Sequence, residues 1–318
     1  MMDYLWLVLG LVLLFFGGEF LVKGSVALAL KLKVSTLVIG VTIVSFATSA
    51  PELIVSLNAA LQGHSDIALG NVIGSNTANI GLILGLTATI FRLSVSKDSY
   101  RFNWPAMAML SLLLFLFSLD GGIGRWEGLF FFVLVILFTS FIIIRSRREG
   151  GIESVPLDQN DIDAVKILSP LKAFLIIIIG TVFLFVGADR LVFGAVNIAS
   201  AMGISERVIG VSIVSIGTSI PELAASLVAA LRNQRELSIG NILGSNIFNI
   251  GAVLGITAFI SPITQVDDKL LTVDIYTMLA FTLGLFIFMR MKPLNEIVHW
   301  QGLLILLSYL AYLYLLFF

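Results

Sequence analysis

The sequence predicts an all-α membrane protein with ten transmembrane helices, arranged as two inverted-topology five-helix repeats. Three observations carry this prediction: the apolar composition, an internal duplication, and an uneven distribution of basic residues. Hydrophobic residues make up 58% of the 318 residues and charged residues only 12%, whereas a soluble domain is just under half apolar and about a quarter charged. Apolar runs such as Tyr4–Phe16 and Leu303–Phe318, extended by small residues, reach the about 20 positions that a helix needs to cross a bilayer. Barrel strands would alternate apolar and polar residues, so these runs predict helices.

Apolar runs between charged and turn-forming residues predict the positions of the spans. We expect ten of them, near 3–22, 34–61, 66–91, 103–119, 126–144, 172–189, 204–231, 236–260, 272–289 and 299–317. Residues 146–169 are polar and predict a cytoplasmic linker that is too short to fold alone. The first apolar run has no basic region before it and no small-residue cleavage site after it, so we expect it to remain as the first span.

An internal duplication divides the chain into residues 1–145 and 170–318. Residues 38–85 align with residues 208–255 at a constant offset of 170, with 27 of 48 positions identical and no gap. Because each unit has five spans, an odd number, the second copy must enter the membrane in the opposite direction.

Basic residues support this inversion. With both termini outside, the predicted inner loops hold 15 lysines and arginines and the outer loops hold 4, as the positive-inside rule requires. The loop Gln62–Asp66 has no lysine or arginine, whereas the equivalent Arg232–Glu236 has two arginines. Inverted repeats are typical of transporters whose ion site lies near the membrane midplane.

Both repeats carry a polar stripe on otherwise apolar helices. In spans 2 and 7 it comprises Ser45, Thr48, Ser49, Glu52 and Ser56, and Ser215, Thr218, Ser219, Glu222 and Ser226. In spans 3 and 8 it comprises Asn71, Ser75 and Asn79, and Asn241, Ser245 and Asn249. A carboxylate in mid-membrane indicates a functional site by default, and no basic residue lies within a turn of Glu52 or Glu222. A bound cation or proton is then the natural partner.

The prolines at positions 51 and 221 add backbone oxygens to this set. Each lacks an amide hydrogen, so the carbonyls of Ala47 and Gly217 lose their helical partners and the neighbouring carbonyls of Thr48 and Thr218 tilt. Carboxylates, carbonyls and hydroxyls suit Ca²⁺ or Na⁺, and no soft ligand is available, because the chain has no cysteine.

Other interpretations apply to the surrounding residues. The glycines of both repeats follow small-xxx-small spacing, which favours close helix packing. The serines at positions 45, 56, 215 and 226 either line an ion path or bond back to their own helix. Glu19 and Asp189 lie beside Lys23 and Arg190 near the predicted span ends, which favours interfacial anchoring. No feature indicates nucleic-acid binding, an obligatory protein partner or a resident cofactor.

At these residues the sequence resembles the sodium/calcium exchanger family of the calcium/cation antiporter superfamily. The motif Ala47-Thr48-Ser49-Ala50-Pro51-Glu52 precedes Gly70-Asn71-Val72-Ile73-Gly74-Ser75-Asn76-Thr77-Ala78-Asn79, and both recur 170 residues later. The resemblance covers essentially the whole chain and is closest to prokaryotic members without regulatory domains. It implies an antiporter, not an enzyme, in the cell membrane of a prokaryote, with Na⁺ driving Ca²⁺ by alternating access as spans 1 and 6 slide against the rest.

The resemblance also implies roles for ten site residues. Glu52 and Glu222 would bind Ca²⁺ and share Na⁺, and the carbonyls of Thr48 and Thr218 would complete the calcium site. The flanking Na⁺ sites and the centre would be lined by Ser49, Ser75, Ser219, Ser245, Asn79 and Asn249. Potassium-dependent relatives and some microbial members have an aspartate where this chain has Asn249, which argues against potassium coupling and leaves two central carboxylates.

Two glutamates balance one Ca²⁺ or two Na⁺, so a third Na⁺ would leave an excess charge that is costly to bury. The closest alternative function is a proton/calcium antiporter, because both glutamates can also exchange Ca²⁺ for protons. A passive channel would not need a duplicated closed site. A diacid protease would need two non-equivalent carboxylates, whereas these two lie in the same repeated motif.

Overall fold

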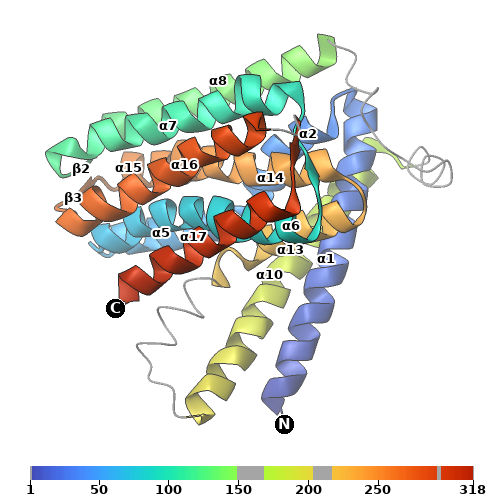
Figure 1. Cartoon of the computed structure of the whole chain (residues 1–318), viewed down its shortest axis with the longest axis horizontal. Coiled ribbons are helices and arrows are strands. Elements are labelled where there is room, and N and C mark those ends of the chain that lie inside the picture. The colour runs from blue at the N-terminus through green and yellow to red at the C-terminus, as the bar shows by residue number, and fades with distance from the viewer. Residues whose placement is uncertain (1, 149–167, 203–216, 292–294, 318) are drawn as a thin grey trace.

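The computed structural model describes residues 2–148, 168–202, 217–291 and 295–317 and confirms the all-α membrane class (Figure 1). In the labels below, η marks π-helical segments, except η4, which is a 3₁₀ turn. The first half comprises α1 (Met2–Leu32), α2 (Thr36–Ile39), η1 (Gly40–Val44), α3 (Ser45–Thr48), α4 (Ala50–Leu61), α5 (Ser65–Ala78), η2 (Asn79–Leu84), α6 (Gly85–Ile90), β1 (Leu93–Ser94), η3 (Ser99–Asn103), α7 (Trp104–Phe117), η4 (Ser118–Asp120), β2 (Gly122–Ile123) and α8 (Arg125–Arg148). The second half comprises α10 (Pro170–Ala201), α13 (Ile220–Leu231), α14 (Arg235–Phe248), η6 (Asn249–Leu254), α15 (Gly255–Ile260), β3 (Ile263–Thr264), η7 (Leu270–Asp274), α16 (Ile275–Arg290), β4 (Glu296–Ile297) and α17 (His299–Phe317).

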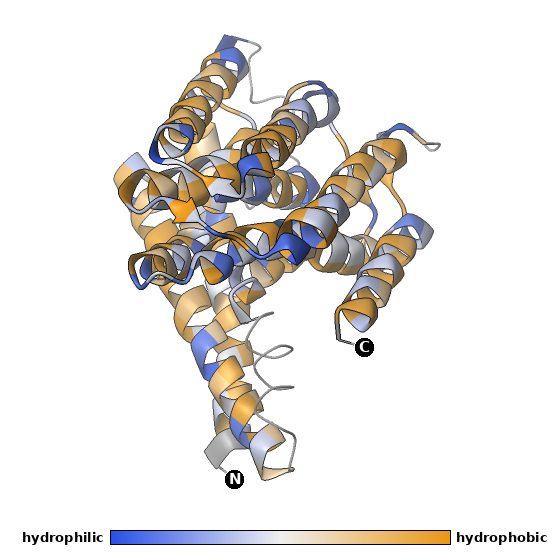
Figure 2. Ribbon diagram, turned by 90° about the vertical axis from the view of Figure 1, so that its left-hand side faces the viewer, coloured by the Kyte–Doolittle hydropathy of each residue, from blue (hydrophilic) through white to orange (hydrophobic). Residues whose placement is uncertain are grey.

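The described residues include eight helices that are long and apolar enough to cross a membrane, and a ninth if the bent pair Thr36–Thr48 and Ala50–Leu61 is one span. Hydrophobic residues predominate along these helices, and hydrophilic residues gather mainly at their ends, as the ribbon colours show (Figure 2). The expected span 204–231 lies outside the described residues up to position 216, and its described part contains α13. The count of ten spans therefore stays a prediction.

Helices at equivalent positions of the two halves have matching lengths. Both α4 and α13 have 12 residues, both α5 and α14 have 14, and both η2 and η6 have 6. The equivalent helices α1 and α10 pack in opposite directions, because Gly10 meets Gly187 and Gly17 meets Gly180. Equivalent helices that run antiparallel are the signature of an inverted repeat.

The predicted lengths of spans 1 and 6 were wrong. Instead of 3–22 and 172–189, α1 has 31 residues and α10 has 32. At 1.5 Å per residue each helix is about 46–48 Å long, well beyond the ~30 Å hydrocarbon layer. Lys23 and Lys31 therefore belong to α1 instead of a loop, and Glu19 and Asp189 lie inside helices instead of near their ends. In Figure 1, α1 and α10 lie side by side and cross the other helices steeply.

Two short antiparallel strand pairs, absent from the prediction, join the halves. Strand β1 of the first half pairs with β4 of the second, and β2 of the first half pairs with β3 of the second. Each pair takes one strand from each repeat, so the backbone itself ties the halves together.

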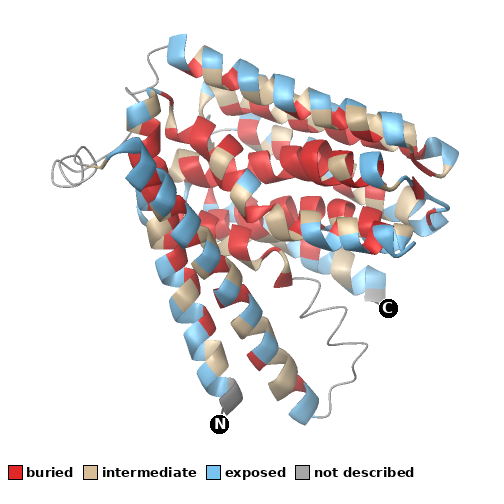
Figure 3. Cartoon of the chain, turned by 180° about the vertical axis from the view of Figure 1, so that it is seen from behind, coloured by how far each residue is buried: buried red, intermediate tan, exposed pale blue. Residues whose placement is uncertain are grey.

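The centre of the molecule is formed by the equivalent segments α5–η2–α6 and α14–η6–α15. In their most apolar stretches, 72% and 89% of residues are buried, against 33% or less in the other unbroken spans. Figure 3 shows this buried centre between the more exposed α1, α10 and α8. Close packing accounts for the predicted glycine pattern in several places, since a Cβ added to Gly240 would lie 2.6 Å from the Leu37 carbonyl oxygen.

Candidate ion-binding site

The first polar motif lies at a break in the helix. Helix α3 ends at Thr48, α4 begins at Ala50, and the two segments are bent by 44°. The amide of Ser49 donates to the Ser45 carbonyl at 2.9 Å, but Pro51 has no amide hydrogen to offer the Ala47 carbonyl. The predicted kink at this proline is confirmed.

The second motif repeats this geometry within its described part. Thr218 and Ser219 form a turn before α13, and Pro221 lies in the first turn of that helix. Glu52 and Glu222 thus occupy the first turns of α4 and α13, where free backbone amides favour a negative charge. Both glutamates are buried, with 1% and 2% of their surfaces exposed.

An asparagine in each half holds the glutamate-bearing helix in place. The Asn71 side chain donates to the Glu52 carbonyl at 3.2 Å and to the Ser56 hydroxyl at 2.9 Å. The Asn241 side chain donates to the Glu222 carbonyl at 3.4 Å and to the Ser226 hydroxyl at 3.0 Å. Both asparagines belong to the predicted polar stripes but are not among the expected ligands. Their occurrence at equivalent positions of the two repeats is the sequence feature that indicates their importance.

Hydrogen bonds of the stripe serines give Ser56 and Ser226 a third role and Ser45 a bond back to its own helix. Ser56 and Ser226 accept hydrogen bonds from the two asparagines, so they anchor the helices. The Ser45 hydroxyl bonds back to the Gly40 carbonyl at 2.7 Å and across to the Asn241 carbonyl at 2.9 Å. Ser215 lies outside the described residues.

The central asparagines open two π-helical segments. Asn79 begins η2 and Asn249 begins η6, and π-helical turns occur frequently at functional sites. Segment η6 contacts α4, which carries Glu52, and η2 contacts α13, which carries Glu222. Each glutamate helix therefore packs against the central segment of the opposite half.

Side chains of the two motifs also meet directly. The Ser49 hydroxyl donates to a carboxylate oxygen of Glu222 at 3.4 Å. The Thr48 hydroxyl donates to the side-chain oxygen of Asn241 at 3.3 Å. Residues of the two motifs, which lie about 170 positions apart in the sequence, therefore converge on one place.

Several predicted ligands keep polar atoms without a partner in the described residues. These buried atoms are Oε2 of Glu52, Oε2 of Glu222, both amide atoms of Asn79, both amide atoms of Asn249, and the hydroxyl oxygen of Ser245. Buried polar groups are nearly always hydrogen-bonded, and an unpaired buried charge costs several kcal/mol. Buried oxygens without partners, including one from each carboxylate, are the type of ligand that a hard cation requires.

Three further predicted ligands belong to the same motifs. Ser75 and Ser219 are buried and Thr218 is half-buried. Among the described residues, neither glutamate is paired with a lysine, arginine or histidine. The described residues also contain no group of three or more acidic, histidine or cysteine side chains that could hold a metal ion.

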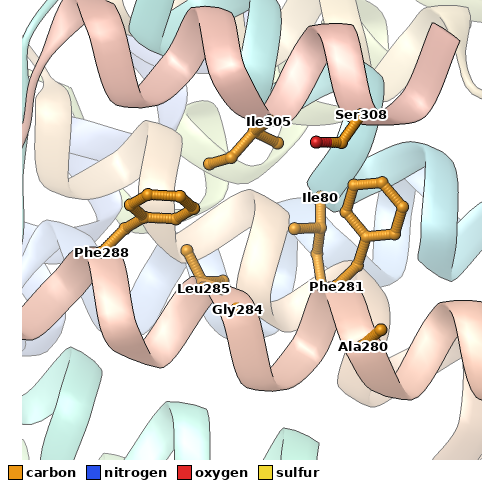
Figure 4. A pocket seen from close by; sticks show the side chains of 8 residues that line it. All are labelled: Ile80, Ala280, Phe281, Gly284, Leu285, Phe288, Ile305 and Ser308. Atoms are coloured by element: carbon orange, nitrogen blue, oxygen red, sulfur yellow. The ribbon is translucent and has the colours of Figure 1, made fainter. Parts of the chain in front are cut away.

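A separate cavity of about 210 Å³ lies between α16 and α17 and reaches Ile80 of η2 (Figure 4). Its lining is apolar except for Ser308, whose hydroxyl donates to the Leu304 carbonyl at 2.8 Å. No charged side chain in the described part of the chain lines this cavity, so it is a poor site for a cation. It is also distinct from the carboxylate site.

Comparison with known proteins accounts for this arrangement. The family model of the sodium/calcium exchanger protein matches residues 2–144 and 172–318. This chain belongs to the sodium/calcium exchanger family. The exchanger is 37% identical over 314 residues to a CaxA protein of Alkalimonas amylolytica, with 98% of both chains covered. It is 30% identical to the sodium/calcium exchanger MaX1 of Methanosarcina acetivorans, with 99% of both chains covered.

A solved structure extends the similarity to the fold. The exchanger superimposes on the sodium-calcium exchanger NCX_Mj, in a structure soaked with Na⁺ and Ca²⁺, with a TM-score of 0.81. The two chains are 32% identical, and the match covers 98% of the exchanger and 97% of NCX_Mj. The exchanger is thus an integral, multi-pass membrane antiporter of Na⁺ and Ca²⁺, and a transporter instead of an enzyme.

Proposed function

We propose that the exchanger moves both ions through one central site formed by the ten predicted residues. Glu52 and Glu222 supply the charge for one Ca²⁺ or two Na⁺, and the carbonyls of Thr48 and Thr218 add backbone ligands. Ser49, Ser75, Ser219 and Ser245 flank the carboxylates, and the two central asparagines line the middle. The unpartnered oxygens around the two buried glutamates carry this proposal.

The transport cycle follows from competition for those oxygens. Because two carboxylates cannot hold Ca²⁺ and two Na⁺ together without excess charge in a region of low dielectric, binding of one cation displaces the other. An inward Na⁺ gradient then drives Ca²⁺ outward as the site opens alternately to the two sides.

The proposal includes the organisation of the chain in the membrane. Residues 1–145 and 170–318 form the inverted repeats, residues 146–169 form a cytoplasmic linker, and both termini face outward in a prokaryotic cell membrane. The opposite basic content of the equivalent loops supports this orientation.

Flux measurements on the purified exchanger in liposomes test the coupling ion. We expect Ca²⁺ uptake when a Na⁺ gradient is imposed, no uptake under a pH gradient alone, and no dependence on K⁺. Uptake driven by the pH gradient without Na⁺ would instead establish proton/calcium antiport.

The same assay tests the site. Glu52→Gln and Glu222→Gln each remove half of the negative charge while keeping the side-chain shape. Loss of one partner from a buried ionic site costs about 3 kcal/mol or more, so we expect Ca²⁺ flux to fall about 100-fold or more. Asp120→Asn, which removes an exposed carboxylate at the end of a span, is the matched control and should keep full activity. Sodium-driven flux retained in both glutamate variants would contradict the assignment.

A further inference from the structure

The long helices α1 and α10 form one closely packed unit. Added Cβ atoms at Gly10 and Gly17 of α1 would lie 2.7 Å and 2.8 Å from backbone nitrogens of α10. At Gly180 and Gly187 of α10 they would lie 2.6 Å and 2.9 Å from backbone nitrogens of α1. Because the backbones touch at four glycines along the pair, the two helices move most readily as one body.

One ionic contact links this unit to the helix that carries Glu222. The Glu19 carboxylate accepts hydrogen bonds from Nε of Arg232 at 2.6 Å and from Nη2 at 2.5 Å. Next to it, a Cβ added to Gly18 would lie 2.7 Å from the Val228 side chain. Two parallel bonds between an arginine and a carboxylate fix orientation as well as distance.

The two ends of α13 connect this contact to the ion site. Arg232 is the C-cap of α13, and Glu222 lies in its first turn. Twelve residues of helix measure about 18 Å, and a helix of this length transmits a displacement along its axis. A shift of Arg232 therefore moves the helix that positions Glu222.

We propose that the Glu19–Arg232 ion pair couples the α1–α10 unit to Glu222 and stabilises the conformation described here over the opposite one of the transport cycle. This inference rests on the alternating access of the proposed function. When α1 slides along α13, the two hydrogen bonds break. Their stabilisation is then present in only one of the two conformations of the transport cycle.

The equivalent positions of the other repeat do not form a matching ion pair. At the offset of 170, Asp189 is the counterpart of Glu19, and Gln62, the C-cap of α4, is the counterpart of Arg232. Asp189 instead lies 3.4 Å from its neighbour Arg190, with 68% of its side chain exposed. Because position 62 carries no charge, the mirror-image contact of the opposite conformation lacks its cation.

Distance measurements between two spin labels test the coupling, and the absence of native cysteine makes the labelling specific. Cysteines replace the exposed Leu11 on α1 and the exposed Leu119 at the end of α7. In the exchanger in liposomes we expect two distance populations. Glu19→Gln should raise the minor one about two- to fivefold, the range for a partly exposed ion pair.

Two further variants separate coupling from damage to the fold. The exchange Glu19→Arg with Arg232→Glu should restore the original populations. Gln62→Arg keeps the native pair and supplies the missing cation to Asp189, so it should also favour the minor population. Unchanged populations in Glu19→Gln would overturn the proposal. If the charge-swapped double variant does not fold, Gln62→Arg takes its place, and unchanged populations in that variant would also overturn the proposal.

Calcium flux in the same liposomes keeps the two conclusions apart. If sodium-driven flux is present and the populations do not respond, the ion-pair proposal fails and the proposed function stands. If the populations respond without any sodium-driven flux, the proposed function fails instead.

Discussion

At the scale of single residues, the charge of the proposed ion site rests on the two carboxylates of Glu52 and Glu222. Asn79 and Asn249 occupy equivalent positions at the starts of η2 and η6, and both contribute neutral oxygens. The site is therefore balanced by one Ca²⁺ or two Na⁺, and a third Na⁺ enters against an uncompensated charge in low dielectric. We therefore expect residue 249 to control how many Na⁺ ions the proposed site binds.

We predict that Asn249→Asp changes the sodium dependence of exchange. A third carboxylate allows a third Na⁺ to bind without excess charge, so Ca²⁺ flux should rise more steeply with Na⁺ concentration, with the Hill coefficient increasing by about one. The measurement is Ca²⁺ flux against Na⁺ concentration in liposomes, and Asn249→Leu, which adds no charge, is the control. Identical steepness in the wild type and the aspartate variant would show that this position does not set the ion count.

At the scale of helices, function depends on where regular structure is interrupted and where backbones touch. The break at Ser49 and the π segments bring polar atoms to the centre, while glycines bring helices close enough to bury it. Gly302 of α17 is one such contact, since an added Cβ would lie 2.5 Å from the Thr89 amide nitrogen. At Gly284 of α16, no atom of the described residues lies within 4 Å of an added Cβ. Two glycines within helices therefore have different roles, one in close packing and one beside open space.

We predict opposite stability changes for the two alanine substitutions. Gly302→Ala forces α17 away from α6 and should cost about 1–3 kcal/mol. Gly284→Ala meets open space beside the apolar cavity and should gain about 0.5–1 kcal/mol from reduced backbone freedom in the unfolded state. Thermal unfolding in one detergent compares them directly, and equal losses in both variants would contradict the packing described.

At the scale of the whole molecule, the two halves are joined by hydrogen bonds, strand pairs and helix packing. Asn241 of the second half accepts a hydrogen bond from Thr48 of the first, and each strand pair joins one repeat to the other. Both glutamate helices pack against the opposite half's central segment. Neither repeat alone contains all ten predicted ligands.

The inverted orientation predicts that equivalent residues face opposite sides of the membrane. Ser65 and Arg235 are equivalent, and both are half-buried. In intact cells, a membrane-impermeant maleimide should label Ser65→Cys, and it should label Arg235→Cys only after permeabilisation. The wild type provides the background because it has no cysteine. Equal labelling of both positions in intact cells would rule out the inversion.

Much of the fold and most of the candidate site could be predicted from the sequence. The reason is that the duplicated motif contains both the glutamates and the residues that bend their helices. Pro51 follows a helical segment and cannot donate a hydrogen bond to the carbonyl of the preceding turn, so the kink beside Glu52 follows from local chemistry. Likewise, a carboxylate flanked by apolar residues has few stable environments other than an ion site.

The features that the sequence did not reveal depend on tertiary contacts. Lys23 and Lys31 end the apolar run, yet α1 continues to Leu32, because a helix longer than the hydrocarbon layer can carry charged residues beyond it. The position of Glu19 near Lys23 and a predicted span end favours anchoring, whereas its partner in the structure, Arg232, is 213 residues away in the chain. The π segments at Asn79 and Asn249 likewise require one extra residue per turn, which packing and not local propensity selects.

The lengths of α1 and α10 have a consequence for the membrane around the exchanger. Helices of 31 and 32 residues fit a hydrocarbon layer of ~30 Å only when they are strongly tilted or extend beyond it. Lipids with longer acyl chains thicken that layer and favour a more upright pair, whereas shorter chains favour a flatter one. We therefore expect the acyl-chain length of the surrounding lipid to change the tilt of these two helices and, through the proposed contact with α13, the rate of exchange.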